Sequence, residues 1–469
     1  MAAAASSARP GRSRSAARTR ARKRPVEYSI LYTATLCLLA AGAVMVYSAS
    51  SAEAVLGGSG DASAYLKRYV LFGLAGLAVM YVLSRKGLAV VREATPMVLL
   101  ISLLLCLLVM VPGLGVTVNG ATRWLGAGPL QFQPSELLKL ALILFTVRLL
   151  AERPQTVQTL KGLARPLLLV VGISCALLMA QPDMGTTMVI CFAIGATLIA
   201  AGTPLRHLAT LAVGLGALAI PLAIFEPYRL ARLTSFLDPF KDAGDSGFQA
   251  VQALTAIGSG GLFGVGLGES VQKIFYLPEA HTDMILAIIG EELGLVGILG
   301  VAVLYGMIGY AGLRTAKAAR DPYSKLLAAG ITSLILCQAT LNFFAVLGMA
   351  PLTGVPLPFI SYGASNLVVL LAGMGLLLNI ADTGGLAAKA RKPGQRAIGG
   401  LRRGAAPPFD VIGLRRGAAP PFDVIGLRRG AAPPFGVLEG GRSGQDRDSG
   451  RRDGRSRGPG SGRRGRATG

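Results

Sequence analysis

The sequence has few charged and few aromatic residues. Only 15% of its 469 residues are charged and 6% are aromatic, whereas 52% are hydrophobic and the mean hydropathy is +0.55. Soluble domains carry about 25% charged residues. The composition therefore excludes an ordinary soluble protein and indicates a membrane protein.

Clustered metal ligands are also lacking. The five cysteines all lie within apolar runs and have no metal-like spacing; they are Cys37, Cys106, Cys175, Cys191 and Cys337. Cysteines in such positions are typical of small buried hydrophobic residues. We therefore predict no metal site.

The net charge of +23 is concentrated at the two ends of the chain. Residues 1–27 carry 8 basic residues and 1 acidic residue, and residues 384–469 carry 19 and 6. The body, residues 28–383, keeps 20 basic and 17 acidic residues. Such tails are typical of cytoplasmic anchors on anionic lipid head groups. Neither tail offers a folded basic face, so we expect no nucleic-acid partner.

The C-terminal tail contains a repeat of 13 residues, LRRGAAPPFDVIG, at 401–413 and 414–426, with a partial third copy at 427–438. The repeats are rich in Gly, Pro and Arg, and cannot bury an apolar face. We predict a disordered Arg-rich N-terminal tail (1–27), a membrane domain (28–383) and a disordered basic C-terminal tail (384–469).

The body contains about ten apolar runs long enough to cross a membrane as helices. Their approximate cores are 29–49, 69–84, 95–113, 136–152, 163–181, 184–201, 206–225, 284–313, 324–349 and 365–382. The sequence therefore predicts an all-α polytopic integral membrane protein. Alternate connections are rich in Lys and Arg, which predicts that both termini are cytoplasmic. A large extracytoplasmic loop, 226–283, then joins helices 7 and 8.

Four polar segments fall on the predicted outer side. In the first, Asn-Gly at 119–120 predicts a turn, and Pro134 begins a helix on which Glu136 and Lys139 share a face. This helix start is either a capped helix with an ordinary surface pair or part of a site. Trp124, the sole tryptophan, is either an interfacial anchor or a site residue.

The second and fourth segments each leave two interpretations open. Asp183 is a turn residue or a functional group. The Pro-rich segment 351–366 is an ordinary outer loop or a re-entrant segment, since non-helical backbone at membrane depth must be buried in protein or line a cavity.

The third segment is the long loop, which ends in a polar cluster. Its glycines at 264, 266 and 268 weakly suggest backbone amides that approach a phosphate, although no Walker or Rossmann pattern is present. Glu279, His281, Thr282 and Asp283 then lead into an apolar helix that carries Glu291 and Glu292. Thr282 and Asp283 could simply cap this helix, but buried carboxylates need partners and suggest function.

At these residues the chain resembles the SEDS family of membrane proteins (FtsW, RodA and SpoVE). The motifs NGATRW, QPSELLKL, QPDMGTT, LPEAHTDMILAIIGEELG and PLTGVPLPFISYG occur in family order within residues 28–383. These motif sequences resemble those of the division branch, FtsW, more than those of RodA. The sequence departs from the family at Gly363-Ala364-Ser365 and at Met349-Ala350-Pro351.

The resemblance implies a peptidoglycan glycosyltransferase that polymerises lipid II at the outer face of a bacterial cytoplasmic membrane, in septal synthesis. It implies a class B penicillin-binding protein and other division or elongation proteins as partners. Asp283 matches the family's essential aspartate, and we predict that it is the catalytic base. The candidate substrate- or pyrophosphate-binding residues are Arg123, Trp124, Glu136, Lys139, Arg229, Arg232, His281 and Ser361.

Glu291 and Glu292 are predicted to line a polar bundle interior. A divalent cation, Mg²⁺ or Mn²⁺, could assist the leaving group, although no ligand set is evident. Two alternatives remain open at this point: a lipid II flippase, for which intramembrane carboxylates would be suitable, and a non-catalytic division scaffold.

Overall fold

The computed structural model describes residues 24–56, 61–118, 120–127, 130–224, 232, 234–241, 243–245 and 247–401. Most of both predicted tails, and Arg229, lie outside these ranges, so the predicted tail disorder stays a prediction. The helices are α1 (Val26–Leu56), α2 (Ala64–Arg85), α3 (Leu88–Val109), α4 (Pro134–Glu152), η1 (Pro154–Gln158), α5 (Leu160–Leu163), η2 (Ala164–Leu168), α6 (Leu169–Ala180), α7 (Met184–Ala200), α8 (Leu205–Ile224), α10 (Phe248–Gly260), α11 (Ile285–Ala318), α12 (Pro322–Val346) and α13 (Ala364–Leu401).

The predicted helical membrane protein is confirmed in its main features. Every predicted apolar segment coincides with a helical stretch, and 7 helices of the described chain are long and apolar enough to cross a membrane. The remaining segments form α4, α7 and α8. That these three also cross the membrane, and that both termini are cytoplasmic, stays a prediction.

A small sheet between α3 and α4 corrects the all-α expectation. Strands β1 (Gly115–Val118), β2 (Ala121–Ala127) and β3 (Leu130–Phe132) pair antiparallel in that order. Val118 pairs with Ala121, which confirms the chain reversal that Asn-Gly predicted; the strands on either side of it, and so the hairpin, were not predicted. The hairpin forms because two short β-branched and aromatic runs flank a two-residue turn.

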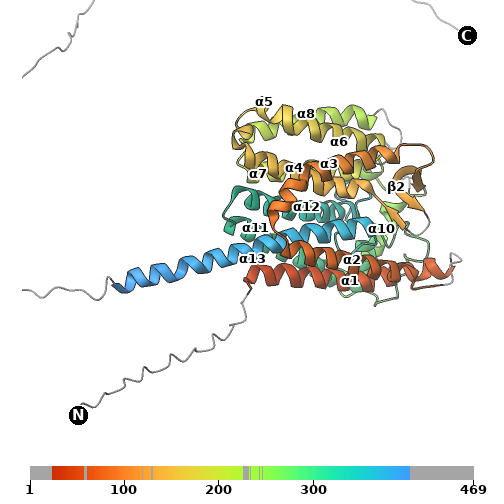
Figure 1. The fold of residues 1–469 in the computed structure, drawn as a ribbon. Coiled ribbons are helices and arrows are strands. Elements are labelled where there is room, and N and C mark those ends of the chain that lie inside the picture. The colour runs from red at the N-terminus through yellow and green to blue at the C-terminus, as the bar shows by residue number, and fades with distance from the viewer. Residues whose placement is uncertain are drawn as a thin grey trace, which may run out of the picture. The chain divides into compact units, whose positions relative to one another are not determined.

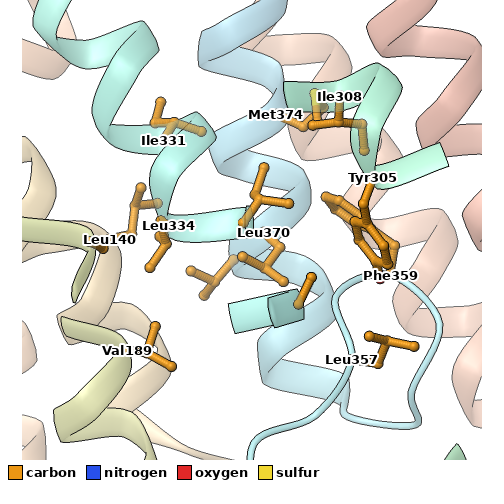
Figure 2. Packing of buried hydrophobic residues seen from close by; sticks show 14 of the residues in the cluster. Leu140, Val189, Tyr305, Ile308, Ile331, Leu334, Leu357, Phe359, Leu370 and Met374 are labelled. Atoms are coloured by element: carbon orange, nitrogen blue, oxygen red, sulfur yellow. The ribbon is translucent and has the colours of Figure 1, made fainter. Parts of the chain in front are cut away.

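Helices pack against sequence neighbours and also against helices that are distant in sequence (Figure 1). α1 lies along α11, α2 along α13, and α12 contacts both α7 and α11. Figure 2 shows the core between α4, α7, α11, α12 and α13, where Leu140, Val189 and Leu370 are among the buried side chains.

The segment before α13 runs through this core without forming a helix. Leu357, Phe359 and Ile360 are buried there, and Figure 2 shows Leu357 and Phe359 on the loop beside Tyr305. The Tyr305 hydroxyl donates to Pro358 O, and the Tyr69 hydroxyl donates to Phe359 O at 2.5 Å. Of the two interpretations left open, an ordinary outer loop and a re-entrant segment, the structure supports the second, because the non-helical segment is buried in the protein.

α11 is interrupted at Gly294, whose φ is +68°. The interruption leaves backbone groups of the helix without intrahelical partners, and the glycine-rich segment after α10 supplies them. The hydrogen bonds are Val265 N to Glu291 O (2.9 Å), Gly266 N to Glu292 O (3.1 Å), Leu295 N to Gly261 O (3.0 Å) and Val296 N to Leu262 O (3.2 Å). The Gly266 amide therefore binds α11, and the Gly264 amide donates to Gly260 O at 2.8 Å, so neither is directed at a phosphate. For Gly268 the suggestion stays a prediction.

Candidate functional site

Three of the polar segments meet at one end of the helices. Asp183 caps α7 by accepting from Thr186 N (3.2 Å), and its other carboxylate oxygen lies 3.2 Å from Ser135 Oγ of α4. Arg123 of β2 donates to the carbonyl oxygens of Gln181 (3.1 Å) and Pro182. Asp183 is thus both a turn residue and the point at which these segments join.

The last polar segment closes over the same end. Its Thr353 carbonyl lies so near Gly185 that a Cβ at Gly185 would be 2.3 Å from that oxygen. Ser365, at the start of α13, accepts from Gln133 N at 2.9 Å. Segments that are more than 150 residues apart in sequence are therefore in direct contact.

Asp283 lies where the long loop reaches this assembly. α11 begins at Ile285, and its N-cap, Met284, makes no side-chain capping bond. Thr282 Oγ1 instead lies 2.7 Å from Glu279 Oε2 and 3.2 Å from Asp283 Oδ1. The interpretation that Thr282 caps the helix is wrong, because its hydroxyl is directed at these two carboxylates.

The surroundings of Asp283 favour its protonated form. Burial, followed by the charge of Glu279, raises the pKa of Asp283 to about 6, while the Thr282 hydroxyl and the Arg232 charge act in the opposite direction. A carboxylate with such a pKa is still ionised at neutral pH and is a stronger base than an ordinary aspartate.

His281 is buried against two tyrosine side chains. Its Nδ1 lies 3.2 Å from Glu53 Oε2 near the end of α1. Its ring centroid is 4.5 Å from that of Tyr65 and 5.6 Å from that of Tyr362, and its carbonyl accepts from Tyr362 N at 3.0 Å. His281 therefore joins α1, α2 and the last polar segment just before Asp283.

Glu136 and Lys139 form a buried pair, not the surface pair of the simpler interpretation. Each side chain is 2% exposed, and Lys139 Nζ lies 2.9 Å from Glu136 Oε2. Lys139 also donates to Gln338 Oε1 of α12 at 2.9 Å. Both polar contacts are internal to the protein, which favours a structural role for this lysine.

The other predicted site residues are partly brought together. Arg232, in the long loop, donates to Leu352 O at 2.6 Å. It therefore contacts the last polar segment, and its charge acts on Asp283. Trp124 lies in β2 opposite Val116. Ser361 is buried and accepts from Leu357 N at 2.7 Å, a bond within its own loop.

Glu291 and Glu292 are buried, and both bind residues of the long loop. Glu291 accepts from Ser270 Oγ and from Val271 N at 3.0 Å. Glu292 accepts from Ser48 Oγ of α1 at 2.6 Å and pairs with Lys273 Nζ at 2.9 Å. Sequence reasoning missed Lys273 and Ser48, because nothing in their local sequence shows that they are partners.

No metal centre is evident in the part of the chain that the structure describes, where no three His, Cys, Asp or Glu side chains are grouped as ligands. The Asp283 carboxylate instead lies beside that of Glu279 and within reach of the Arg232 charge, and Arg123 binds the 181–183 turn. Fold and site together define a multi-pass membrane protein with an acidic site between its connecting loops.

The family model described as "cell cycle protein", which groups FtsW, RodA and SpoVE, matches residues 29–384. The chain belongs to this family, and the predicted family is confirmed. It is 40% identical to a probable peptidoglycan glycosyltransferase FtsW of Geobacter sp. (strain M18), over 72% of this chain and 92% of the relative. It is 39% identical to the stage V sporulation protein E of Bacillus subtilis (strain 168), over 75% and 96%.

Solved structures are similar as well. A chain of a peptidoglycan synthase complex aligns with a TM-score of 0.62 and 31% identity, over 76% of this chain and 97% of that chain. The rod shape determining protein RodA of Thermus thermophilus aligns with a TM-score of 0.55 and 30% identity, over 75% and 95%. The chain is accordingly a multi-pass protein of the bacterial cytoplasmic membrane.

Proposed function

We propose that this protein is a peptidoglycan glycosyltransferase that polymerises lipid II at the outer face of the cytoplasmic membrane. Relatives about 40% identical carry the name of that enzyme class. The observation that carries the proposal is the position of Asp283: a carboxylate with a pKa of about 6, at the meeting point of the polar loops.

In the proposed reaction Asp283 is the general base. The acceptor sugar hydroxyl attacks the anomeric carbon of the lipid-linked donor and transfers its proton to the Asp283 carboxylate. The bond between the anomeric carbon and the pyrophosphate oxygen breaks, and its electron pair leaves with the lipid pyrophosphate. A positioned base contributes about 10²–10⁴-fold to such a step.

The leaving pyrophosphate needs cationic donors. Arg232 is the first candidate because its charge acts on Asp283 and its guanidinium lies on the adjoining loop. Arg123 is the second, on the hairpin beside the 181–183 turn. Lys139 is less suitable, since its ammonium is buried against Glu136 and Gln338.

The partner and the cellular role belong to the proposal too. Because the chain is similar to a chain of a peptidoglycan synthase complex, we propose that it works with a class B penicillin-binding protein. The Geobacter relative, 40% identical to this chain, is named a probable FtsW, and this supports a role in septal synthesis. A transporter is disfavoured by Glu291 and Glu292, whose carboxylates hold the long loop in place.

The test is polymerisation of lipid II by the purified chain, with and without a cognate class B penicillin-binding protein. Asp283→Asn should lower the rate by at least about 10²-fold. Asp321→Asn is the matched control, since Asp321 caps α12 through Ser324 N (2.8 Å) and is outside the site. Glycan chains of near-normal amount from folded Asp283→Asn would refute the base assignment.

A further inference from the structure

Two amide side chains of α12 hold the non-helical segment that precedes α13. Gln338 and Asn342 are spaced by four residues, so they share one face of the helix, and both are buried. Gln338 Nε2 donates to Pro356 O at 2.9 Å, and Asn342 Nδ2 donates to Val355 O at 2.8 Å. Consecutive carbonyls of the segment are thus bound by consecutive turns of the helix.

Asn342 makes a second bond, which reaches Asp283. Its Nδ2 also donates to the backbone oxygen of Asp283 at 2.7 Å. A side-chain amide nitrogen carries two hydrogens, so both are used. One buried amide therefore links α12, the last polar segment and the main chain of the proposed base.

The carboxylate of Asp283 faces the same segment. Gly354, with φ of +68°, precedes Val355, and a Cβ built at Gly354 would lie 3.7 Å from Asp283 Oδ2. The distance between Asp283 and this segment is consequently set on two sides, by the Asn342 amide and by the Gly354 backbone.

We propose that Asn342 is a positioning residue for the transfer reaction: it ties the main chain of Asp283 to the segment at 354–356 and fixes where the carboxylate meets the acceptor hydroxyl. This inference rests on the proposed function of Asp283. Gln338 serves a different partner, since its carbonyl oxygen binds Lys139 and its amide also reaches Asn366 Oδ1 at 3.1 Å.

Loss of the Asn342 amide has two expected consequences. The carboxylate loses its fixed position, and a displacement of about 1 Å lowers kcat by about 10²-fold. Asp283 is already partly exposed, and water gains further access to it, while its charged neighbours Glu279 and Arg232 stay in place. The acid limb of the kcat profile should therefore move to lower pH, and KM should change little.

The variant is Asn342→Leu, which keeps the volume and removes the amide. Asn379→Leu is the matched control, because Asn379 is a buried amide of α13 that donates to the carbonyls of Leu83 (3.2 Å), Ser84 (3.0 Å) and Lys86 (2.6 Å), away from the site. Polymerisation of lipid II is measured against pH with the full chain and its partner synthase. We expect the lower kcat and the shifted acid limb for Asn342→Leu alone.

A wild-type acid limb and kcat in Asn342→Leu would overturn the inference, and so would a loss equal to that of Asn379→Leu with an unmoved acid limb. If Asn342→Leu does not fold, Asn342→Ser carries the same test, since its hydroxyl is too short to reach both carbonyls. Failure of the proposed function gives a different result, because Asp283→Asn would then polymerise normally.

Discussion

Lys273 and Glu292 form an ion pair that is almost completely buried. Nζ and Oε1 are 2.9 Å apart, and the side chains are 6% and 0% exposed. Ser48 Oγ lies within hydrogen-bond distance of both, at 3.1 Å from the ammonium and 2.6 Å from the carboxylate. The pair therefore fastens the loop that ends in Asp283 to both α1 and α11.

Removal of one member of this pair should be strongly destabilising. Lys273→Met leaves the Glu292 carboxylate buried without its counter-ion, and we expect a loss of about 3–5 kcal/mol in the free energy of unfolding. The double variant Lys273→Met with Glu292→Leu should recover most of that loss. Denaturant titration of the purified protein in detergent gives the free energy of unfolding of each variant and measures both effects.

Lys67 provides the control for that measurement. It pairs with Asp61 at 2.7 Å, but the side chains are 68% and 45% exposed, and exposed pairs contribute about 0–1 kcal/mol. Lys67→Met should therefore change stability little. Equal losses for Lys67→Met and Lys273→Met would show that burial of the inner pair does not matter.

Two glycines of the segment after α10 should respond differently to alanine. Gly264 and Gly268 both have positive φ, +83° and +89°. A Cβ at Gly264 would be 2.1 Å from Glu292 O, whereas a Cβ at Gly268 would meet nothing within 4 Å. We expect Gly268→Ala to cost roughly 1–2 kcal/mol and Gly264→Ala to cost more than about 4 kcal/mol.

Thermal unfolding of the two glycine variants in parallel checks this prediction. Both substitutions carry the same backbone strain, so the difference between them isolates the contact with α11. A similar loss in both variants would mean that the segment can move away from α11 without consequence.

The helices could be predicted from sequence because burial in a membrane acts on whole apolar runs, and such runs are visible locally. The hairpin at 115–127 was missed except for its turn, because its strands are too short for a clear alternation. The interruption at Gly294 was missed as well: a glycine inside an apolar run does not reveal that Val265 and Gly266 will bind the neighbouring carbonyls.

For the candidate site, the sequence identified the polar segments but not the contacts between them. Asp283 was predicted as the candidate base because polar residues are dense around it and because its motif resembles that of a family. Ser48 and Lys273 are 225 positions apart, and no periodicity connects them. Lys139 was assigned to the substrate because it matches a family motif position at the predicted outer edge, whereas in the structure its ammonium is bound by Gln338 of α12.

The role of Lys139 can be separated from that of a substrate-binding lysine. Lys139→Met leaves the Glu136 carboxylate buried without its counter-ion. The free energy of unfolding should fall by about 3–5 kcal/mol, and polymerisation should fall as well. Lys139→Met with Glu136→Leu removes both charges and should restore folding. If the lysine is structural, lipid II polymerisation by the double variant should return to within about tenfold of wild type, an expectation that rests on apolar replacement of buried pairs being tolerated.

The control for this pair is Arg232→Gln, which removes a guanidinium near Asp283. We expect it to lower polymerisation without a comparable loss of stability, because Arg232 is only partly buried. A stable but inactive Lys139 and Glu136 double variant would contradict the structural role and return Lys139 to the pyrophosphate.

The pH dependence of activity and of stability should both report Asp283. As a base it must be ionised, so kcat should fall tenfold per pH unit below about 6 and level off above it.

Stability should change with pH in the opposite direction to activity. The folded pKa of Asp283, about 6, lies above the ordinary value of 3.8, so the folded state binds the proton more tightly. The stabilising contribution of protonated Asp283 is complete below pH 3.8 and is lost as the pH rises to about 6. Asp283→Asn cannot titrate, and relative to wild type it should gain stability across this window and stay constant above it. Unfolding of both proteins between pH 4 and 8 measures the difference, and a difference that does not change with pH would contradict the raised pKa.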